Sequence, residues 1–170
     1  MDKNLTYAGI GSRSTPEPIL IKMREIAKFL AKKGYTLRSG GARGADYDGF
    51  EIGCDAANGP KEIYLPWKGF NNNLSNLEWT QEGWNLAAKF HPNWDNLKLG
   101  AKQLMARNSH QILGWDLKSP SCFVVCWTEG GKMIGGTSQA LRIAIANNIK
   151  IYNLGEENGL DKFREHCKII

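Results

Sequence analysis

Short apolar runs alternate along this chain with longer segments in which apolar positions recur at helical spacing. The apolar runs predict strands near residues 5–10, 35–39, 62–65, 122–127 and 149–153. The helical spacing predicts helices near residues 17–33, 45–57, 76–90, 97–112, 137–147 and 159–167. Such alternation is typical of an α/β fold, here a Rossmann-like, mostly parallel sheet with helices on both faces.

The stretch from about residue 67 to 120 departs from this alternation. It contains five of the six tryptophans and no clear strand. We therefore expect a helical, Trp-rich insertion, either a cap over one sheet edge with the tryptophans as its core, or a lid or subunit contact. With 170 residues, the chain has the length of one domain, so we expect residues 1–170 to form a single unit.

Three glycine-rich loops, each between an expected strand and an expected helix, are the main chemical signal. They are Gly11–Pro16, the run Ser39-Gly40-Gly41-Ala42-Arg43-Gly44-Ala45-Asp46, and Glu129–Ser138. A helix N-terminus reached through such a loop presents unpaired N–H groups and a positive dipole end, which suit a phosphate. In parallel sheets these loops meet at the carboxyl ends of the strands, so one shared site is expected. None of them is a GxGxxG fingerprint or a Walker A loop.

A second polar group lies within the insertion. Arg107, Asn108 and Gln111 fall within one helical turn, so they can face one direction. An arginine there could bind a phosphate through two donors, with the two amides reading a base or a sugar. The alternative is a solvated helix face. His91 and His110 have no carboxylate partner nearby in sequence, and we expect structural or surface roles for both.

Composition limits the remaining choices. The formal net charge is +5, and the basic residues are scattered, so any nucleic-acid binding should be weak. No apolar run approaches the ~18 residues of a membrane span, and the N-terminus lacks a signal peptide, so a cytoplasmic location without membrane contact is expected. The four cysteines show no CxxC spacing; Cys122 and Cys126 are expected to be buried thiols, and neither a metal nor a cofactor is expected.

Taken together, Gly11-Ser12-Arg13, the loop from Ser39 to Asp46 and Gly136-Thr137 resemble the SLOG superfamily. That superfamily joins the DNA-processing protein DprA (Smf) with the LOG cytokinin-activating phosphoribohydrolases. The resemblance extends from Tyr7 to Asn153. The loop from Ser39 to Asp46 resembles that of DprA, and the segment from His91 to Asn153 is most similar to a phage and prophage branch of unassigned role. It implies a Rossmann-like fold, a nucleotide or nucleotide-derived ligand, homo-oligomers and, for a phage protein, the host cytoplasm.

The resemblance also implies which residues bind the ligand. The implied set is Gly11, Ser12 and Arg13 on one side, Gly40, Gly41, Arg43, Gly44 and Asp46 at the centre, and Gly135, Gly136, Thr137 and Ser138 around a phosphate. Ser39 of the same loop, with Asn108 and Gln111 of the insertion, completes the predicted ligand-binding residues. We expect the N–H groups of Gly41 and Gly136 to be unpaired and to point into one pocket. Arg107 resembles the arginine that the phosphoribohydrolases place beside their PGGxGTxxE loop.

The chain departs from that PGGxGTxxE loop. The proline is missing, and the position of the catalytic glutamate falls on Ala140, next to Gln139. Asp46, at the end of the loop that begins at Ser39, and Glu51, just after it, are the remaining candidates for a catalytic carboxylate. Arg107 is a third catalytic candidate.

Three functions stay open at this point. The first is hydrolysis of the N-glycosidic bond of a nucleoside 5′-monophosphate or a related nucleotide metabolite. The second is a non-catalytic sensor or sequestering protein for a signalling nucleotide, which would make it a counter-defence protein in a phage. The third is a DprA-like binder of single-stranded DNA.

Overall fold

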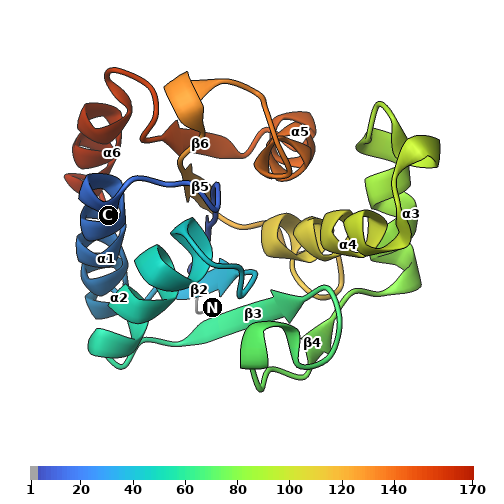
Figure 1. Ribbon diagram of the computed structural model, residues 1–170. Helices are drawn as coiled ribbons and strands as arrows, with labels where there is room; N and C mark the ends of the chain where they lie inside the picture. The colour runs from blue at the N-terminus through green and yellow to red at the C-terminus, as the bar shows by residue number, and fades with distance from the viewer. Residues whose placement is uncertain (1–3) are drawn as a thin grey trace.

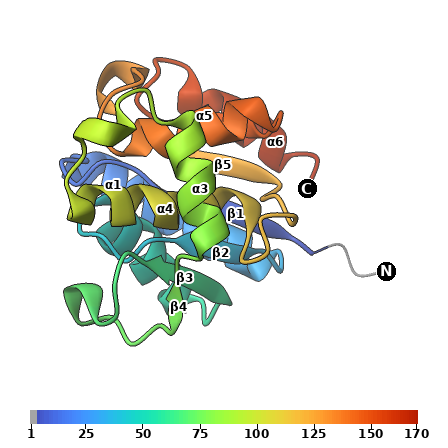
Figure 2. The ribbon, with the colours of Figure 1, turned by 90° about the vertical axis from the view of Figure 1, so that its right-hand side faces the viewer.

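A six-stranded sheet lies between two layers of helices in the computed structural model, which describes residues 4–170 (Figures 1 and 2). All the strand pairs in this part of the chain are parallel, and the sheet order is β4-β3-β2-β1-β5-β6. The strands are β1 (Thr6–Gly9), β2 (Thr36–Ser39), β3 (Lys61–Leu65), β4 (Leu77–Glu78), β5 (Phe123–Cys126) and β6 (Lys150–Asn153). The α/β, Rossmann-like fold is confirmed, and its winding reverses between β1 and β5.

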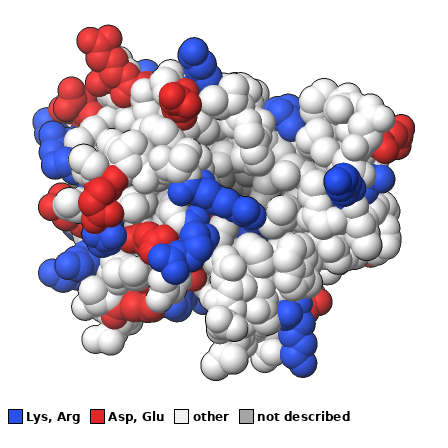
Figure 3. All heavy atoms as spheres, in the orientation of Figure 1, with Lys and Arg blue, Asp and Glu red and all other residues white. Residues whose placement is uncertain are grey.

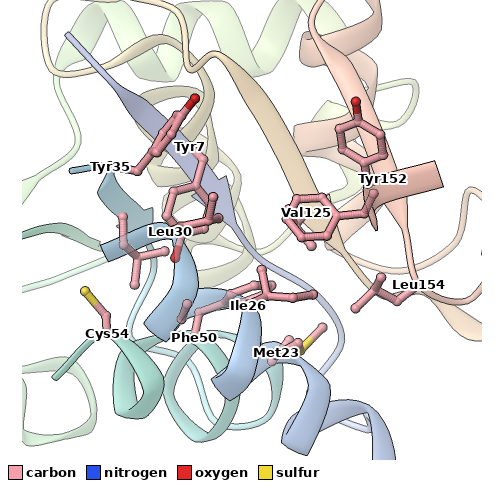
Figure 4. Close-up of a cluster of buried hydrophobic side chains, with 14 of the residues drawn as sticks. Tyr7, Met23, Ile26, Leu30, Tyr35, Phe50, Cys54, Val125, Tyr152 and Leu154 are labelled. Atoms are coloured by element: carbon pink, nitrogen blue, oxygen red, sulfur yellow. The ribbon is translucent and has the colours of Figure 1, made fainter. Parts of the chain in front are cut away.

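One face of the sheet is covered by α1 (Glu17–Lys32), α2 (Ile52–Ala56) and α6 (Gly159–Cys167) (Figure 1). Side chains alternate along a strand, so Tyr7 and Phe123 point into this layer. They pack there with α1, whose buried Met23 and Leu30 are spaced as the sequence predicts. Figure 4 shows this cluster, in which Phe50 lies close to Ile26 and Met23.

The other face is covered by α4 (Leu99–Leu113) and α5 (Thr137–Ala146), with α3 (Gln81–Phe90) packed outside them (Figures 1 and 2). Ala8 and Val124 of the central strands, both fully buried, contribute to this second core together with Ile112 of α4 and Ile143 of α5. Since helices cover both faces, the middle strands are buried throughout. No helix within residues 4–170 is long and apolar enough to cross a membrane.

The insertion differs from the sequence-based prediction in two ways. It contributes the edge strand β4, which pairs with β3, so the expectation of no strand in this stretch is wrong. The helix expected from residue 76 begins only at Gln81, because Thr80 caps it: the Thr80 hydroxyl accepts from the Gly83 N–H at 3.1 Å. The remaining short elements are 3₁₀ turns at Phe70–Asn72, Trp94–Asn96 and Glu129–Gly131.

The tryptophans of the insertion form a core only in part. Trp79, Trp84 and Trp94 contact one another in series, with 5.1 Å between neighbouring ring centroids. Trp67 and Trp115 are exposed. Among the cysteines, Cys126 is buried as expected but Cys122 is exposed, because it lies just before β5 rather than within it.

The helix expected over 45–57 is also different. Residues Ala45–Glu51 form a π-helix, and only Ile52–Ala56 is α-helical. The Tyr47 N–H donates to the Ala42 carbonyl and the Gly49 N–H to the Gly44 carbonyl, both five residues back. We call the loop from Ser39 to Asp46 the glycine loop. The π-helix is wider than an α-helix where the chain leaves this loop, and such turns are frequent at functional sites.

Candidate functional site

A cavity of about 520 Å³ opens where the winding of the sheet reverses, at the carboxyl ends of β1 and β5. Ligands bind preferentially at this position in open α/β sheets, and the volume is within the roughly 300–1,000 Å³ of small-molecule sites. Its wall comes from the loops after β1, β2 and β5 and from one face of α4. Basic side chains lie at the centre of the face shown in Figure 3, next to a hollow.

Asp46 contributes a buried carboxyl group to the cavity. The π-helix holds it with 4% of its surface exposed. Burial raises the pKa of Asp46 to about 6, while Arg107 and the backbone N–H groups of Ala42, Gly11 and Gly40 act in the opposite direction. A carboxyl group with such a pKa exchanges its proton near neutral pH.

Arg107 enters the cavity from α4 and is also buried. Its guanidinium donates to the carbonyl of Gly40 and, at 3.3 Å, to that of Leu104. Burial lowers the pKa of Arg107, which the carboxylate of Asp46 partly offsets. A Cβ on Gly40 would meet Arg107, Gln111 and, at 2.7 Å, Oδ2 of Asp46, so three polar side chains converge over this glycine.

The N-terminus of α5 forms another part of the wall. Within residues 4–170 the N–H groups of Gly136 and Thr137 have no acceptor. Nδ2 of Asn108 donates to the Gly136 carbonyl at 3.2 Å and holds this turn against α4. Arg13 lines the same cavity, and its positive charge acts on Arg107. Two guanidiniums and a helix N-terminus make this wall electropositive.

Ala140, the residue on which the sequence resemblance places the glutamate of the phosphoribohydrolases, lies in the cavity wall. The neighbouring Gln139 points away: its Nε2 donates to the Ala87 carbonyl at 3.0 Å, and its Oε1 accepts from Arg142 at 2.8 Å. In the described part of the chain, the carboxylates that line the cavity are therefore Asp46 and the exposed Glu129.

The structure brings most of the site residues predicted from the sequence to this cavity. Those that line it are Gly11, Ser12, Arg13, Asp46, Arg107, Asn108, Gln111, Gly135, Gly136 and Thr137. Those that lie outside its wall are Ser39, Gly40, Gly41, Arg43, Gly44, Glu51 and Ser138. Arg107, Asn108 and Gln111 are buried, which excludes the solvated helix face. The ligand-binding and catalytic roles of all of these residues stay predictions.

Several residues outside the wall have other partners. The Ser39 hydroxyl donates to the Gly9 carbonyl at 2.7 Å and joins the ends of β2 and β1. Arg43 pairs with Asp48 at 2.9 Å and faces a separate hollow outside the central loop. The Ser138 hydroxyl donates to the Gly135 carbonyl at 2.6 Å. These contacts shape the loops without placing the side chains in the cavity.

The expectation for Gly41 is wrong. Its N–H donates to Oε2 of Glu51 at 3.0 Å, so it does not point into the cavity. The reason is the π-helix, which turns Glu51 back toward the glycine loop. Gly136 keeps the unpaired N–H that the sequence predicts, within the residues described.

The sequence did not indicate the apolar part of the wall. Ile10, Leu104, Met105 and Ile134 line the cavity beside the polar groups. Leu104 lies three residues before Arg107, on the same face of α4, and this helical spacing is the signal that could have found it. Across residues 4–170, no group of three or more His, Cys, Asp or Glu side chains is placed to hold a metal.

No family model and no curated protein matches this sequence. Solved structures do. The molybdenum cofactor carrier protein of Chlamydomonas reinhardtii has a TM-score of 0.54 and 17% identity, over 98% of this chain and 85% of the other. DprA of Helicobacter pylori, solved for its single-stranded DNA binding, has a TM-score of 0.57 and 18% identity, over 97% of this chain and 74% of the other.

DprA of Streptococcus pneumoniae has a TM-score of 0.56 and 14% identity, and the match covers 96% of this chain but 57% of that protein. Identities this low show the fold alone. DprA is one of the proteins that the sequence resembles, and this chain shares its Rossmann-like fold. The phage branch of that resemblance stays a prediction.

Proposed function

We propose that this protein binds a small, phosphorylated, nucleotide-type ligand and holds it without cleaving it. The observation that carries the proposal is which residues the N-terminus of α5 contributes to the cavity wall. The unpaired N–H groups of Gly136 and Thr137 favour an anion, while Ala140 supplies a methyl group where a hydrolase of this type needs a carboxylate. The cavity thus combines an anion-binding wall with the loss of the expected catalytic group.

The remaining walls suit the other parts of such a ligand. Arg13 and Arg107 would balance the phosphate charge, and Gln111 and Asp46 would hydrogen-bond sugar or base atoms deeper in the cavity. Leu104 and its apolar neighbours offer a surface for a flat ring. Two of the similar structures are a molybdenum cofactor carrier and a DNA-binding protein. Each of these two proteins is described by what it binds, and this supports a ligand-binding role for the same fold here.

The test begins with mass spectrometry of the small molecules that remain bound through purification. Calorimetry then follows with nucleoside mono-, di- and cyclic phosphates and with the molybdenum cofactor, and chromatography examines each mixture after incubation. We expect one class to bind and to be recovered intact. Free base together with sugar phosphate would overturn the proposal and establish the hydrolase.

That hydrolase is the second candidate, and the carboxyl group of Asp46 favours it. Asp46 lines the cavity, and its pKa of about 6 suits a group that stabilises a sugar cation or activates water. If the protein cleaves nucleotides, Asp46→Asn should retain the ligand but lose turnover by orders of magnitude. If it only binds, the wild-type protein should be inert, and the same substitution should change affinity alone.

A further inference from the structure

Glu51 is a buried acid next to the cavity, yet outside its wall. Its side chain is 1% exposed, and Oε2 accepts the N–H of Gly41 at 3.0 Å. The other carboxyl oxygen, Oε1, has no hydrogen-bond partner in the described part of the chain. A buried polar atom without a partner is rare in proteins and calls for an explanation.

The π-helix explains how Glu51 reaches this position. Asp46 and Glu51 are five residues apart, which in an α-helix of 3.6 residues per turn would turn their side chains well apart. The five-residue hydrogen bonds of the π-helix bring residues at this separation toward the same side. One short helix therefore supplies both an acid in the cavity wall and an acid behind the glycine loop.

The glycine loop depends on contacts of this kind for its shape. Gly41 has a φ of 67°, a left-handed conformation that favours glycine. Its N–H is bound by Glu51, and its carbonyl accepts from Nδ2 of Asn71 at 3.0 Å. Gly41 is flanked by Gly40, whose carbonyl is bound by Arg107, and by Ala42, which lines the cavity. Without the Glu51 contact, the backbone at Gly41 could change its conformation, and Gly40 and Ala42 would move with it.

Burial and two neighbouring acids oppose the ionisation of Glu51, and two basic side chains partly offset them. The negative charges of Asp46, on the same helix, and of Asp55, on α2, raise the pKa of Glu51. The positive charge of Lys61, on β3, lowers the pKa of Glu51, but its Nζ is already paired with Asp55 at 2.7 Å. The guanidinium of Arg107, on α4, donates to the Gly40 carbonyl, and its charge interacts with Asp46 and, more weakly, with Glu51. The Gly41 N–H favours the carboxylate over the neutral acid, but burial and the charge of Asp46 outweigh it. An ionised Glu51 would therefore be stabilised by moving toward water, away from its place behind the loop.

We propose that Glu51 is a positioning residue: as a neutral acid it holds Gly41 and the adjoining cavity wall in place, and its ionisation loosens that wall. Burial, followed by the charge of Asp46, raises the pKa of Glu51 to about 8. The neutral form therefore predominates at pH 7 and is lost as the pH rises through about 8. The consequence for ligand affinity rests on the proposed function, whereas the state of the loop does not.

The experiment follows the backbone amide of Gly41 in the ligand-free, full-length protein by ¹H–¹⁵N NMR between pH 6 and 9.5. We expect its resonance to titrate near pH 8, and the amides of residues 40–45 to exchange at least tenfold faster above that pH than their intrinsic rates explain. Glu51→Gln keeps an acceptor of the same shape without a charge, so it should abolish both effects. Glu62→Gln is the matched control. Glu62 is a part-buried acid that binds Arg38 and Tyr64, so this variant should titrate as the wild type does.

A Gly41 amide that stays unchanged up to pH 9.5, or that titrates equally in Glu51→Gln, overturns the proposal. If the variant does not fold, the wild-type titration decides alone. Sulfate then serves as the binding probe, because its charge is constant over this range. Its affinity should fall about tenfold between pH 7 and 9 in the wild type and much less in Glu51→Gln. If sulfate binds to neither protein, the anion site of the proposed function fails, while the Gly41 titration still decides the role of Glu51.

Discussion

Gly40 and Gly136 both belong to glycine loops at the cavity, but they differ in the room they leave for a side chain. A Cβ on Gly40 would overlap Arg107, Gln111 and Asp46. Gly136 has a helical φ of −65°, and a Cβ there would meet only Cε of Met105, at 3.4 Å. The same glycine-to-alanine change should therefore have opposite consequences at the two positions.

We expect Gly40→Ala to lose about 1–3 kcal/mol of stability, because three packed polar side chains must move. Gly136→Ala should keep its stability or gain up to about 1 kcal/mol through a less flexible unfolded chain. Its added methyl group stands beside the unpaired N–H groups, so it should still weaken ligand binding. Urea unfolding measures the first effect and calorimetry the second. Equal stability of the two variants would contradict the crowding of Gly40 by these three side chains.

The loops that line the cavity could be predicted from the sequence better than the direction of their side chains. Glycines and alanines in 39–46 indicate a tight loop, and Asp46 follows it, so its place at the cavity could be predicted. The partner of the Gly41 N–H could not. It depends on the π-helix that turns Glu51 back, and the residue pattern predicts an ordinary helix over 45–57.

At the level of elements, α3 is attached to α4 through His110. The Thr80 N–H donates to Nε2 of His110 at 3.0 Å, and the Thr80 hydroxyl caps α3. Because Nε2 is an acceptor, Nδ1 carries the proton and donates to the Gly114 carbonyl at 3.1 Å. Burial lowers the pKa of His110 below its usual 6.5, so the ring is neutral at pH 7. Protonation would place a hydrogen on Nε2, against the Thr80 N–H.

Acid should therefore detach the start of α3. The pKa of His110 is lower in the folded state than in the unfolded state, so its stabilising contribution is complete above about pH 6.5 and is lost as the pH falls. Hydrogen exchange of residues 80–91 should rise between pH 7 and 5 beyond its intrinsic dependence. His110→Gln should weaken the attachment at pH 7 and remove the change with pH, whereas His91→Gln should behave as the wild type. Unchanged acid sensitivity in His110→Gln would exclude this role.

Elements with a long periodic pattern were the ones that could be predicted. The sixteen residues of α1 show apolar residues at helical spacing, and the helix forms close to where expected. The two-residue strand β4 has no such pattern. It exists because Leu77 and Glu78 pair with β3, and because the Ser75 hydroxyl fixes the chain to the Ile63 carbonyl at 2.5 Å. Tertiary contacts of that kind leave no periodic signal in the sequence.

For the whole molecule, the alternation of strands and helices was enough to predict a parallel sheet with loops gathered at one edge. What it could not supply was the strand order. Since the chain winds outward to β4 before returning to β5 and β6, the loops after β1 and β5 become neighbours, and the cavity lies between them. The insertion then closes the remaining side with α4. Site residues from Gly11 to Thr137 meet only because of this order.

The distribution of charge over the whole molecule bears on DNA binding. The net charge is +5, but Arg43, Lys61 and Arg24 are each paired with an acid, and Arg107 is buried. The cavity of about 520 Å³ suits a small molecule rather than a polymer strand. Any affinity for single-stranded DNA should therefore come from the release of counterions alone.

Such binding is expected to be weak and dependent on salt. Fluorescence anisotropy with a labelled oligonucleotide should give a Kd of roughly 10⁻⁴–10⁻⁶ M near physiological salt, tightening steeply at lower salt. A saturating dose of the nucleotide found by calorimetry should not displace the DNA, because the two would bind at different places. Tight binding that persists at high salt would require bases stacked on aromatic side chains. Competition by the nucleotide would place the DNA in the cavity, and either result would favour the DprA-like function over the proposed one.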